Sequence, residues 1–246
     1  MKKPLLLLFL LITTLTWAQE NMPVYMHYVT VKSSDADKLI SLEKNYFSKM
    51  HKQNIDSGKK IGWDMWRMEN QSDAGHTTFV YTHLQHSLDE MELSGGGSDL
   101  FSEAELKMAN EQWASMIVSS KLLVTSFKGG FAPIKEEPVN VVQLGFMNVD
   151  PLSYYEYEQM ELKNFLPAHK KNPLVKGWAL HSIDTPHAED EDDYLVANFF
   201  ENLNDMYKNS GSVSQLSKQE KANYKAILNL RKMTKVEVLT LVMAER

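Results

Sequence analysis

Two helical stripes of the form Glu-x-x-x-Phe-x-x-x-His carry the side chains best suited to chemistry. Their members are Glu43, Phe47 and His51 in the first stripe, and Glu161, Phe165 and His169 in the second. A spacing of four residues places three side chains along one face of a helix. At about 1.5 Å of rise per residue, the glutamate and the histidine lie about 12 Å apart and cannot share a hydrogen bond. The functional interpretation is an acid and a titratable base that flank a ligand cleft.

The same stripes also allow a purely structural interpretation. Each histidine would then lie in the last turn of its helix, where the helix dipole stabilises the cationic imidazole. Each glutamate would point to solvent or cap a backbone group. The presence of the stripe at two places in the chain does not distinguish the two interpretations.

Two Gly-Trp pairs, with Trp63 and Trp178, begin predicted strands. Glycine allows close approach of another group, and tryptophan supplies a large apolar wall. The pairs are therefore either structural wedges at a barrel seam or platforms for a ligand. The side chains that we expect to contact a ligand are Trp63, Trp66, Trp178, His181, Phe47 and Phe165.

These patterns recur because the chain is a tandem duplication. Residues 24–54 align with 142–172 at an offset of 118, and residues 62–105 align with 177–220 at an offset of 115. This period is too long for a solenoid and indicates two like domains. We predict a first repeat over residues 22–128, a linker over 129–138 and a second repeat over 139–246.

Positions at which the repeats differ are where a function held by one repeat would reside. His27, Trp66 and His83 of the first repeat align with Gly145, His181 and Asn198 of the second. We therefore predict a polar cleft in the first repeat that combines His27, Trp66 and His83. The alternative cleft in the second repeat would combine Gln143, His181 and Asn198. Either cleft would take its catalytic group from a strand histidine or from a stripe glutamate or histidine.

Each repeat is predicted to run strand, helix, strand, strand, short helix, helix, strand. Expected strands are 24–32, 61–68, 77–84 and 122–127 in the first repeat, with 175–183, 194–200 and 235–242 among those of the second. Capping boxes at Ser102–Glu105 and Ser217–Glu220 begin the second long helices, 102–119 and 216–232. Residues 87–93 suggest a helical turn, and Pro167 predicts a kink or an early helix end. A βαββαβ order is the ferredoxin-like plan.

The middle strands are apolar on both faces, so both faces of each sheet are expected to be buried. Packing the two bare sheet faces on each other achieves this. The predicted fold class is thus α+β, with two tandem ferredoxin-like repeats packed sheet to sheet as a pseudo-symmetric α/β barrel. In this respect the chain resembles the dimeric α/β-barrel superfamily, here in a tandem single-chain form. That superfamily includes antibiotic-biosynthesis-type monooxygenases, stress-responsive barrel proteins, muconolactone isomerases and chlorite-dismutase-like haem proteins.

The start of the chain indicates export. Lys2 and Lys3 precede an apolar run over residues 5–15, and Thr16-Trp17-Ala18 offers small residues for a signal peptidase. We therefore predict a signal peptide over residues 1–18 and a soluble periplasmic or secreted protein. The sequence has no cysteine, so it contains no site for a lipoprotein anchor, and no later segment is apolar enough to enter a membrane. Each repeat must also fold without disulfides.

Composition and motifs exclude several classes of function. The net charge is −6, and an acidic chain without a basic stripe argues against nucleic acid as a partner. No zinc, calcium or phosphate-binding motif is present, so no metal site is expected. The resemblance implies that a haem would take its axial histidine from the second long helix. Residues 102–119 and 216–232 contain no histidine, so neither haem nor another cofactor is expected.

Three functions agree with these observations. The first is an exported protein that binds a small, partly aromatic molecule in a cleft between sheet and helices. The second is a cofactor-independent monooxygenase or isomerase that uses a His or Glu base. The third is a structural or interaction module without an open cleft. The sequence leaves further oligomerisation open.

Overall fold

The computed structural model describes residues 22–89, 99–133, 139–209 and 216–246. The first repeat consists of strand β1 (Pro23–Lys32), the short 3-10 turn η1 (Ser33–Asp35), helix α1 (Ala36–Leu42), the π-helical turn η2 (Glu43–Phe47), helix α2 (Ser48–Asp56), strands β2 (Gly62–Met68) and β3 (His76–Leu84), helix α3 (Glu103–Met116) and strand β4 (Ile117–Phe131).

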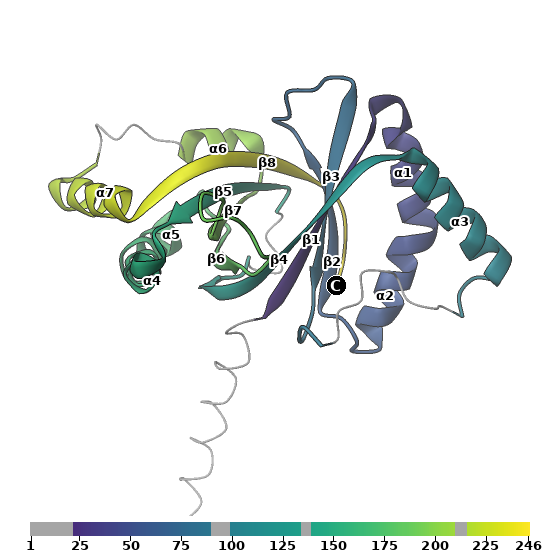
Figure 1. Cartoon of the computed structure of the whole chain (residues 1–246), viewed down its shortest axis with the longest axis horizontal. Coiled ribbons are helices and arrows are strands. Elements are labelled where there is room, and N and C mark those ends of the chain that lie inside the picture. The colour runs from purple at the N-terminus through teal and green to yellow at the C-terminus, as the bar shows by residue number, and fades with distance from the viewer. Residues whose placement is uncertain (1–21, 90–98, 134–138, 210–215) are drawn as a thin grey trace, which may run out of the picture.

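The second repeat follows the same order, and its described residues also include the short helix α6, whose counterpart in the first repeat would lie mostly outside the described ranges. It consists of β5 (Val141–Val149), η3 (Pro151–Ser153), α4 (Tyr154–Met160), the π-helical turn η4 (Glu161–Phe165), α5 (Leu166–Lys171), β6 (Gly177–Ile183), β7 (Tyr194–Phe200), α6 (Leu203–Asn209), α7 (Lys218–Leu230) and β8 (Arg231–Glu245). Figure 1 shows the helices of the two repeats at opposite ends of the molecule.

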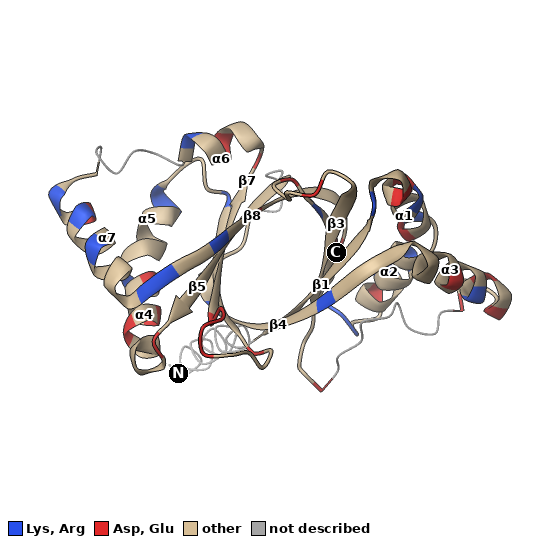
Figure 2. Cartoon of the chain, turned by 45° about the horizontal axis from the view of Figure 1, so that its top comes forward, with Lys and Arg blue, Asp and Glu red and all other residues tan. Residues whose placement is uncertain are grey.

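The strands of both repeats form one closed antiparallel barrel. Within the repeats the strand orders are β4-β1-β3-β2 and β8-β5-β7-β6, and the pairs β2–β8 and β4–β6 join the two sheets. Figure 2 shows the ring of strands with helices covering two opposite outer sides. The predicted fold class is confirmed, and the sheets are joined along their edges as well as facing each other.

The two joining strands are longer than predicted. β4 and β8 each contain 15 residues, whereas the sequence indicated 122–127 and 235–242. The reason is that each strand pairs with its own repeat along its first part and with the other repeat along its last part. The extra residues therefore close the barrel by pairing with the other repeat. The sequence pattern of one repeat alone does not predict such pairs.

Three apolar clusters form the core. One fills the barrel and draws side chains from both repeats, among them Trp66, Val80, Leu144 and Leu195. The other two lie between each sheet and its own helices. Both faces of the sheet are thus buried, as the doubly apolar strands predicted.

Local signals in the sequence place the helix ends well. Both predicted capping boxes are present, at Ser102–Glu105 and Ser217–Glu220. Pro167 lies in the first turn of α5, directly after the π-helical turn η4, and α5 is shorter than its counterpart α2. This position is acceptable for proline because its missing N–H is not needed there.

Residues 129–131, which we assigned to the linker, belong to strand β4. A register shift between Phe127 and Gly129 lets β4 run beside β6. At Gly130 a Cβ atom would lie 2.1 Å from the backbone oxygen of Trp178 and 2.9 Å from Cα of Ala179. Backbone atoms cannot move aside cheaply, so this contact requires glycine.

We therefore expect Gly130→Ala to lower the free energy of unfolding by about 1–3 kcal/mol, as overpacking does elsewhere. The control is Gly75→Ala, because a Cβ there would meet only Asp73 Oδ1, at 3.3 Å. Urea melts of both variants measure the difference. A Gly130→Ala protein as stable as the Gly75→Ala protein would show that β4 and β6 can separate without cost.

Two predictions concern residues outside the described ranges. The signal peptide over 1–18 lies there, and so does most of the helical turn over 87–93. Among the described residues, no helix combines the length and the apolar character needed to cross a membrane.

Candidate functional site

The two glutamates of the helical stripes each begin a π-helical turn. In η2 the N–H of Ser48 donates to the carbonyl of Glu43, and in η4 the N–H of Leu166 donates to the carbonyl of Glu161. Such turns insert one extra residue into a helix, cost stability and occur often at functional sites. Their presence at the same aligned position in both repeats points to the glutamates as the residues to examine first.

Glu43 is a buried carboxyl group held by neutral donors. Its side chain is 3% exposed, and its Oε1 accepts hydrogen bonds from Tyr81 Oη at 2.9 Å and from Trp113 Nε1 at 3.0 Å. Burial raises the pKa of Glu43 from 4.5 to about 7, and the two hydrogen bonds lower it in part. In the described part of the chain, no lysine or arginine forms an ion pair with Glu43.

His27 completes this site, which we call the Glu43 cluster (Glu43, Tyr81, Trp113 and His27). The imidazole lies 6.0 Å from the Tyr81 ring and 6.1 Å from the Trp113 ring, measured between centroids. Burial lowers the pKa of His27, so its imidazole is neutral near pH 7. His27 and Trp113 are half-buried, which places the Glu43 carboxyl group only one side chain below the surface.

A second polar cluster lies deeper under α2. Lys60 Nζ lies 3.1 Å from Nδ1 of His51 and 3.0 Å from Nδ1 of His83, and all three residues are buried. The His51 ring stacks on Trp63 at 4.9 Å. Because a protonated lysine can only donate, both Nδ1 atoms must accept, which fixes the remaining imidazole proton on Nε2.

The histidines of this cluster are neutral. Burial, and then the charge of Lys60, lowers the pKa of His51 to about 3 and that of His83 well below 6.5. The structural interpretation of the stripes, a cationic histidine in the last helical turn and a solvent-facing glutamate, is therefore wrong for Glu43 and His51. Desolvation outweighs any gain from the helix dipole here.

In the second repeat the equivalent glutamate is charge-paired. Glu161 is buried, and its Oε1 lies 3.7 Å from Arg231 Nε. Burial raises the pKa of Glu161 to about 7, while Arg231 and Tyr157 lower it in part. His169 stacks on Trp178 at 5.5 Å, and burial lowers its pKa to about 4. The scaffold is shared, but the second repeat places a guanidinium beside the carboxyl group.

The predicted cleft of His27, Trp66 and His83 does not exist as one site. His27 pairs with Tyr81 in the β1–β3 register, and Trp66 pairs with Val80 in the β2–β3 register. Neighbouring residues of a strand point to opposite faces, so Trp66 lies inside the barrel whereas His27 and His83 face the helices. His27 and His83 are thus brought to one face of the first repeat, as predicted, without Trp66.

The remaining predicted ligand contacts are distributed over several environments. Trp63 and Trp178 are fully buried, which favours the structural interpretation of the Gly-Trp pairs. His181 lies inside the barrel, where its Nδ1 is 3.3 Å from Thr125 Oγ1 and burial lowers its pKa to about 4. Phe47 and Phe165 are half-buried on the stripe helices.

Sequence reasoning missed three residues of these clusters, namely Tyr81, Trp113 and Lys60. Tyr81 faces the helices because it pairs with His27, and that pairing was not known from the sequence. Trp113 comes from α3, 70 positions from Glu43 along the chain. Tyr81 could have been identified from the difference between the repeats, because it aligns with Val196 of the second repeat and carries a hydroxyl group that valine lacks.

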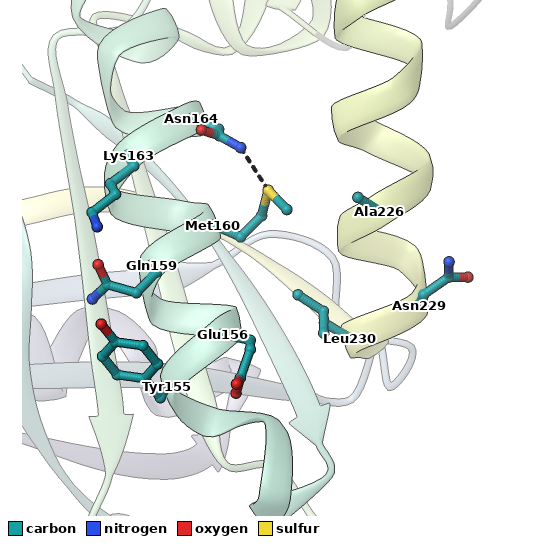
Figure 3. A pocket seen from close by; sticks show the side chains of 9 residues that line it. All are labelled: Tyr155, Glu156, Gln159, Met160, Lys163, Asn164, Ala226, Asn229 and Leu230. Carbon is teal, nitrogen blue, oxygen red and sulfur yellow. Dashed lines mark hydrogen bonds between the residues drawn. The ribbon is translucent and has the colours of Figure 1, made fainter.

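Two open hollows of the described structure lie between helices. A groove of about 530 Å³ separates α4 and η4 from α7 (Figure 3) and is lined by Tyr155, Glu156, Gln159, Met160, Lys163, Asn164, Ala226, Asn229 and Leu230. A groove of about 400 Å³ occupies the equivalent place in the first repeat. Both are wide open to solvent, whereas Glu43 is buried.

The residues do not fit a haem or a bound metal. α3 and α7 contain no histidine, and the face of the first sheet toward its helices is occupied by buried residues such as Trp63 and Tyr81. Within the described ranges, no group of three or more His, Asp or Glu side chains could hold a metal ion. We therefore derive no chemistry through such a group, and function without a cofactor stays a prediction.

Comparison with known proteins identifies the fold. No protein-family model matches the chain, and no curated protein sequence matches it. Among solved structures, a candidate monooxygenase of Lactobacillus acidophilus superposes with a TM-score of 0.62 at 9% identity, covering 91% of this chain and 96% of its own. A candidate monooxygenase of Fusobacterium nucleatum gives 0.59 at 11%, covering 92% and 95%. An anthrone oxidase-like protein gives 0.56 at 11%, covering 93% and 94%.

The chain therefore has the dimeric α/β-barrel fold, with both halves of the barrel in one polypeptide. The predicted resemblance is confirmed at the level of the fold. Since one fold hosts many activities, the function must be argued from the Glu43 cluster.

Proposed function

We propose that the first repeat binds a small, partly aromatic molecule beside the Glu43 cluster and that Glu43 removes an acidic proton from it. The observation that carries this proposal is the environment of Glu43. A carboxyl group with a pKa near 7 is well matched to accept a proton at neutral pH and to give it up again. The half-buried rings of Trp113 and His27 supply an aromatic surface next to it.

The comparison with solved structures supports this type of substrate. One structure of the same fold belongs to an anthrone oxidase-like protein. An anthrone is an aromatic ketone with an acidic CH₂ group, which is the kind of molecule that a carboxylate base activates. Because identity to that protein is 11%, the support concerns the class of chemistry and not a particular substrate.

The residues of the cluster have separate tasks in this step. The C–H bond of the substrate breaks, its proton passes to the Glu43 carboxylate, and the electron pair stays on the substrate as an enolate. Tyr81 holds Glu43 Oε1 in place through its hydrogen bond. Neutral His27 lies at the mouth of the cluster and can donate a hydrogen bond to the enolate oxygen. Return of the proton to another carbon gives an isomer, and reaction of the enolate with O₂ gives an oxygenated product.

Access requires a movement of side chains. Glu43 is 3% exposed, so a ligand reaches it only when Trp113 or His27 turns aside. Trp113 lies on the last turn of α3, and the strand residues after it, 118–121, are exposed. A ligand that enters here takes the place of the Trp113 ring and keeps the apolar contact with the sheet.

Hydrogen–deuterium exchange of an anthrone's CH₂ group, followed by NMR without oxygen, tests the proposal. We expect the purified protein to increase the exchange rate. This rate should rise as pH increases through about 7, because Glu43 can accept a proton only in its ionised form. Glu43→Gln should lower the rate about a hundredfold.

Glu161→Gln in the second repeat is the matched control and should keep the native exchange rate. Loss of exchange in Glu161→Gln but not in Glu43→Gln would place the site in the second repeat. Binding of the anthrone that persists in every variant without any exchange would favour the alternative of a binding protein. Absence of both binding and exchange would favour a structural or interaction module, an alternative that the filled space between sheet and helices supports.

We further propose that the protein is exported and that residues 1–18 are its signal peptide. The support is the sequence of that segment, with two lysines followed by an apolar run and small residues. N-terminal sequencing of the protein from its own cells should begin at Gln19. A chain that begins at Met1 and stays in the cytoplasm would contradict this.

A further inference from the structure

The hydroxyl of Tyr81 is a buried proton donor with a base directly in front of it. Tyr81 is 3% exposed, and its Oη donates to Glu43 Oε1 at 2.9 Å. Removing one electron from a phenol makes its proton strongly acidic. A buried tyrosine is therefore readily oxidised only where a neighbouring group accepts that proton, and the Glu43 carboxylate is such a group.

Three other tyrosine–carboxylate pairs of the described residues lack this combination. Tyr28 donates to Glu237 at 2.7 Å, but Lys235 neutralises that carboxylate at 2.9 Å. Tyr154 donates to Asp193, which also accepts from the backbone N–H of Val149 at 2.7 Å. Such added donors make a carboxylate a weaker proton acceptor.

Tyr194 and Glu158, joined at 3.0 Å, form the pair most similar to Tyr81 and Glu43. Its ring neighbours within the described residues are the tyrosines Tyr154 and Tyr157, without a tryptophan. Tyr81 instead has oxidisable tryptophans of the first repeat nearby, because Trp63 stacks on its ring and Trp113 donates to the same Glu43 oxygen.

Those tryptophans connect Tyr81 to solvent and to the interior. Half-buried Trp113 donates to the same Glu43 oxygen at 3.0 Å. Fully buried Trp63 stacks on Tyr81 with 6.0 Å between ring centroids. Tryptophan and tyrosine are the aromatic side chains that lose an electron most easily, so the three rings form a path from the surface into the repeat.

We propose that Tyr81 is a redox-active tyrosine, which gives an electron to an oxygen-centred radical of the peroxyl class while its proton passes to Glu43. The O–H bond of Tyr81 breaks, the electron reduces the peroxyl radical to the hydroperoxide anion, and a neutral tyrosyl radical and a protonated Glu43 remain. An external one-electron reductant, such as ascorbate, restores the tyrosine as Glu43 returns the proton. In this way the Glu43 cluster would reduce peroxyl radicals that form beside it when an organic molecule reacts with O₂.

Flash photolysis of the purified protein with a ruthenium polypyridyl oxidant tests the proposal, with EPR of rapidly frozen samples as the readout. We expect a neutral tyrosyl radical in the native protein and none in Tyr81→Phe, which keeps the ring and loses only the hydroxyl. Tyr194→Phe, the matched control, should give the native signal. Glu43→Gln should lower the tyrosyl yield and leave a tryptophan radical.

The dependence on pH distinguishes this step from accidental oxidation. The tyrosyl yield should rise with pH through about 7, as Glu43 becomes a carboxylate. The groups that face Glu43 are Tyr81 on β3, Trp113 on α3 and, beside them, His27 on β1, and the imidazole of His27 stays neutral over this range.

A native tyrosyl signal in Tyr81→Phe, or an unchanged yield in Glu43→Gln, would overturn the proposal. The step shares Glu43 with the proposed proton removal but does not depend on it. Exchange of an anthrone proton needs no oxidant, and radical formation needs no anthrone. Each experiment can therefore fail while the other succeeds.

Discussion

Trp63→Ala and Trp178→Ala should each lower the free energy of unfolding by about 3–5 kcal/mol, the usual cost of truncating a buried aromatic side chain. Both tryptophans are fully buried at equivalent places between a sheet and its first helix. Each also stacks on the stripe histidine of its repeat, at 4.9 Å for His51 and 5.5 Å for His169. Alanine would leave a cavity, because the strands of the closed barrel cannot move inward to fill the space.

Guanidinium melts of both variants measure this loss. Leu152→Ala is the control, because Leu152 is 92% exposed and its truncation should change stability by less than about 0.5 kcal/mol. We expect the two tryptophan variants to lose similar amounts, since the repeats support each other through the same barrel. A loss below about 1 kcal/mol in both variants would show that the tryptophans line a space able to open, as a ligand platform would.

The architecture could be predicted because it depends on patterns that repeat along the chain. The constant offsets between the repeats, the two capping boxes and the apolar strands together define two βαββαβ units. A sheet with helices on one face needs cover on the other, and a duplicated chain supplies it. The joining of the two sheets by β4 and β8 was not predicted, because it depends on pairs between repeats.

The candidate site could be predicted only in part. The stripe identified Glu43 and His51 as paired features of one helix, and the divergence between repeats identified His27 and His83. The stripe did not show that Glu43 is buried. A π-helical turn changes the direction in which a side chain points and leaves no clear pattern in the sequence. Trp66 was wrongly grouped with His27 and His83. The alternation of side chains tells which residues of one strand share a face, but which residues of two strands share a face depends on the register between them.

Comparison of the two glutamates shows how a duplicated scaffold can hold different chemistry. Glu43 is held by two neutral donors, whereas Glu161 has a guanidinium 3.7 Å away. Burial nevertheless raises the pKa of both carboxyl groups to about 7. The same position in the two repeats therefore holds a buried carboxyl group with different partners, a tyrosine and a tryptophan in one repeat and a guanidinium in the other.

Acidification should destabilise the protein before the surface carboxylates are protonated. Burial lowers the pKa of His51 to about 3, lowers those of His169 and His181 to about 4, and lowers that of His83 well below 6.5. Between about pH 4.5 and 6.5, the unfolded chain binds a proton at His51, His169 and His181 and the folded chain does not, and His83 acts in the same direction. Stability is therefore lost as pH falls through this range.

The two buried glutamates act in the opposite direction. Burial raises the pKa of Glu43 and Glu161 from 4.5 to about 7, so the folded chain holds two protons that the unfolded chain lacks over the same range. Their contribution is complete below pH 4.5 and is lost as pH rises through about 7. Three imidazoles against two carboxyl groups leave a net loss of about 1.4 kcal/mol per pH unit on acidification, and His83 adds to it. Over two pH units this loss is a substantial fraction of the stability of a typical domain.

Urea melts at a series of pH values from about 7 to 4.5 give this slope, and three variants assign it. His181→Asn removes one titrating imidazole and should make the slope shallower by about 1.4 kcal/mol per pH unit. Glu43→Gln removes an opposing carboxyl group and should make the slope steeper by the same amount. His86→Asn, at an exposed position, should leave the slope unchanged. A slope in Glu43→Gln equal to that of the native protein would mean that the Glu43 carboxyl group is already ionised in the folded state at pH 5, and the base proposed for the first repeat would then have an ordinary carboxylate pKa.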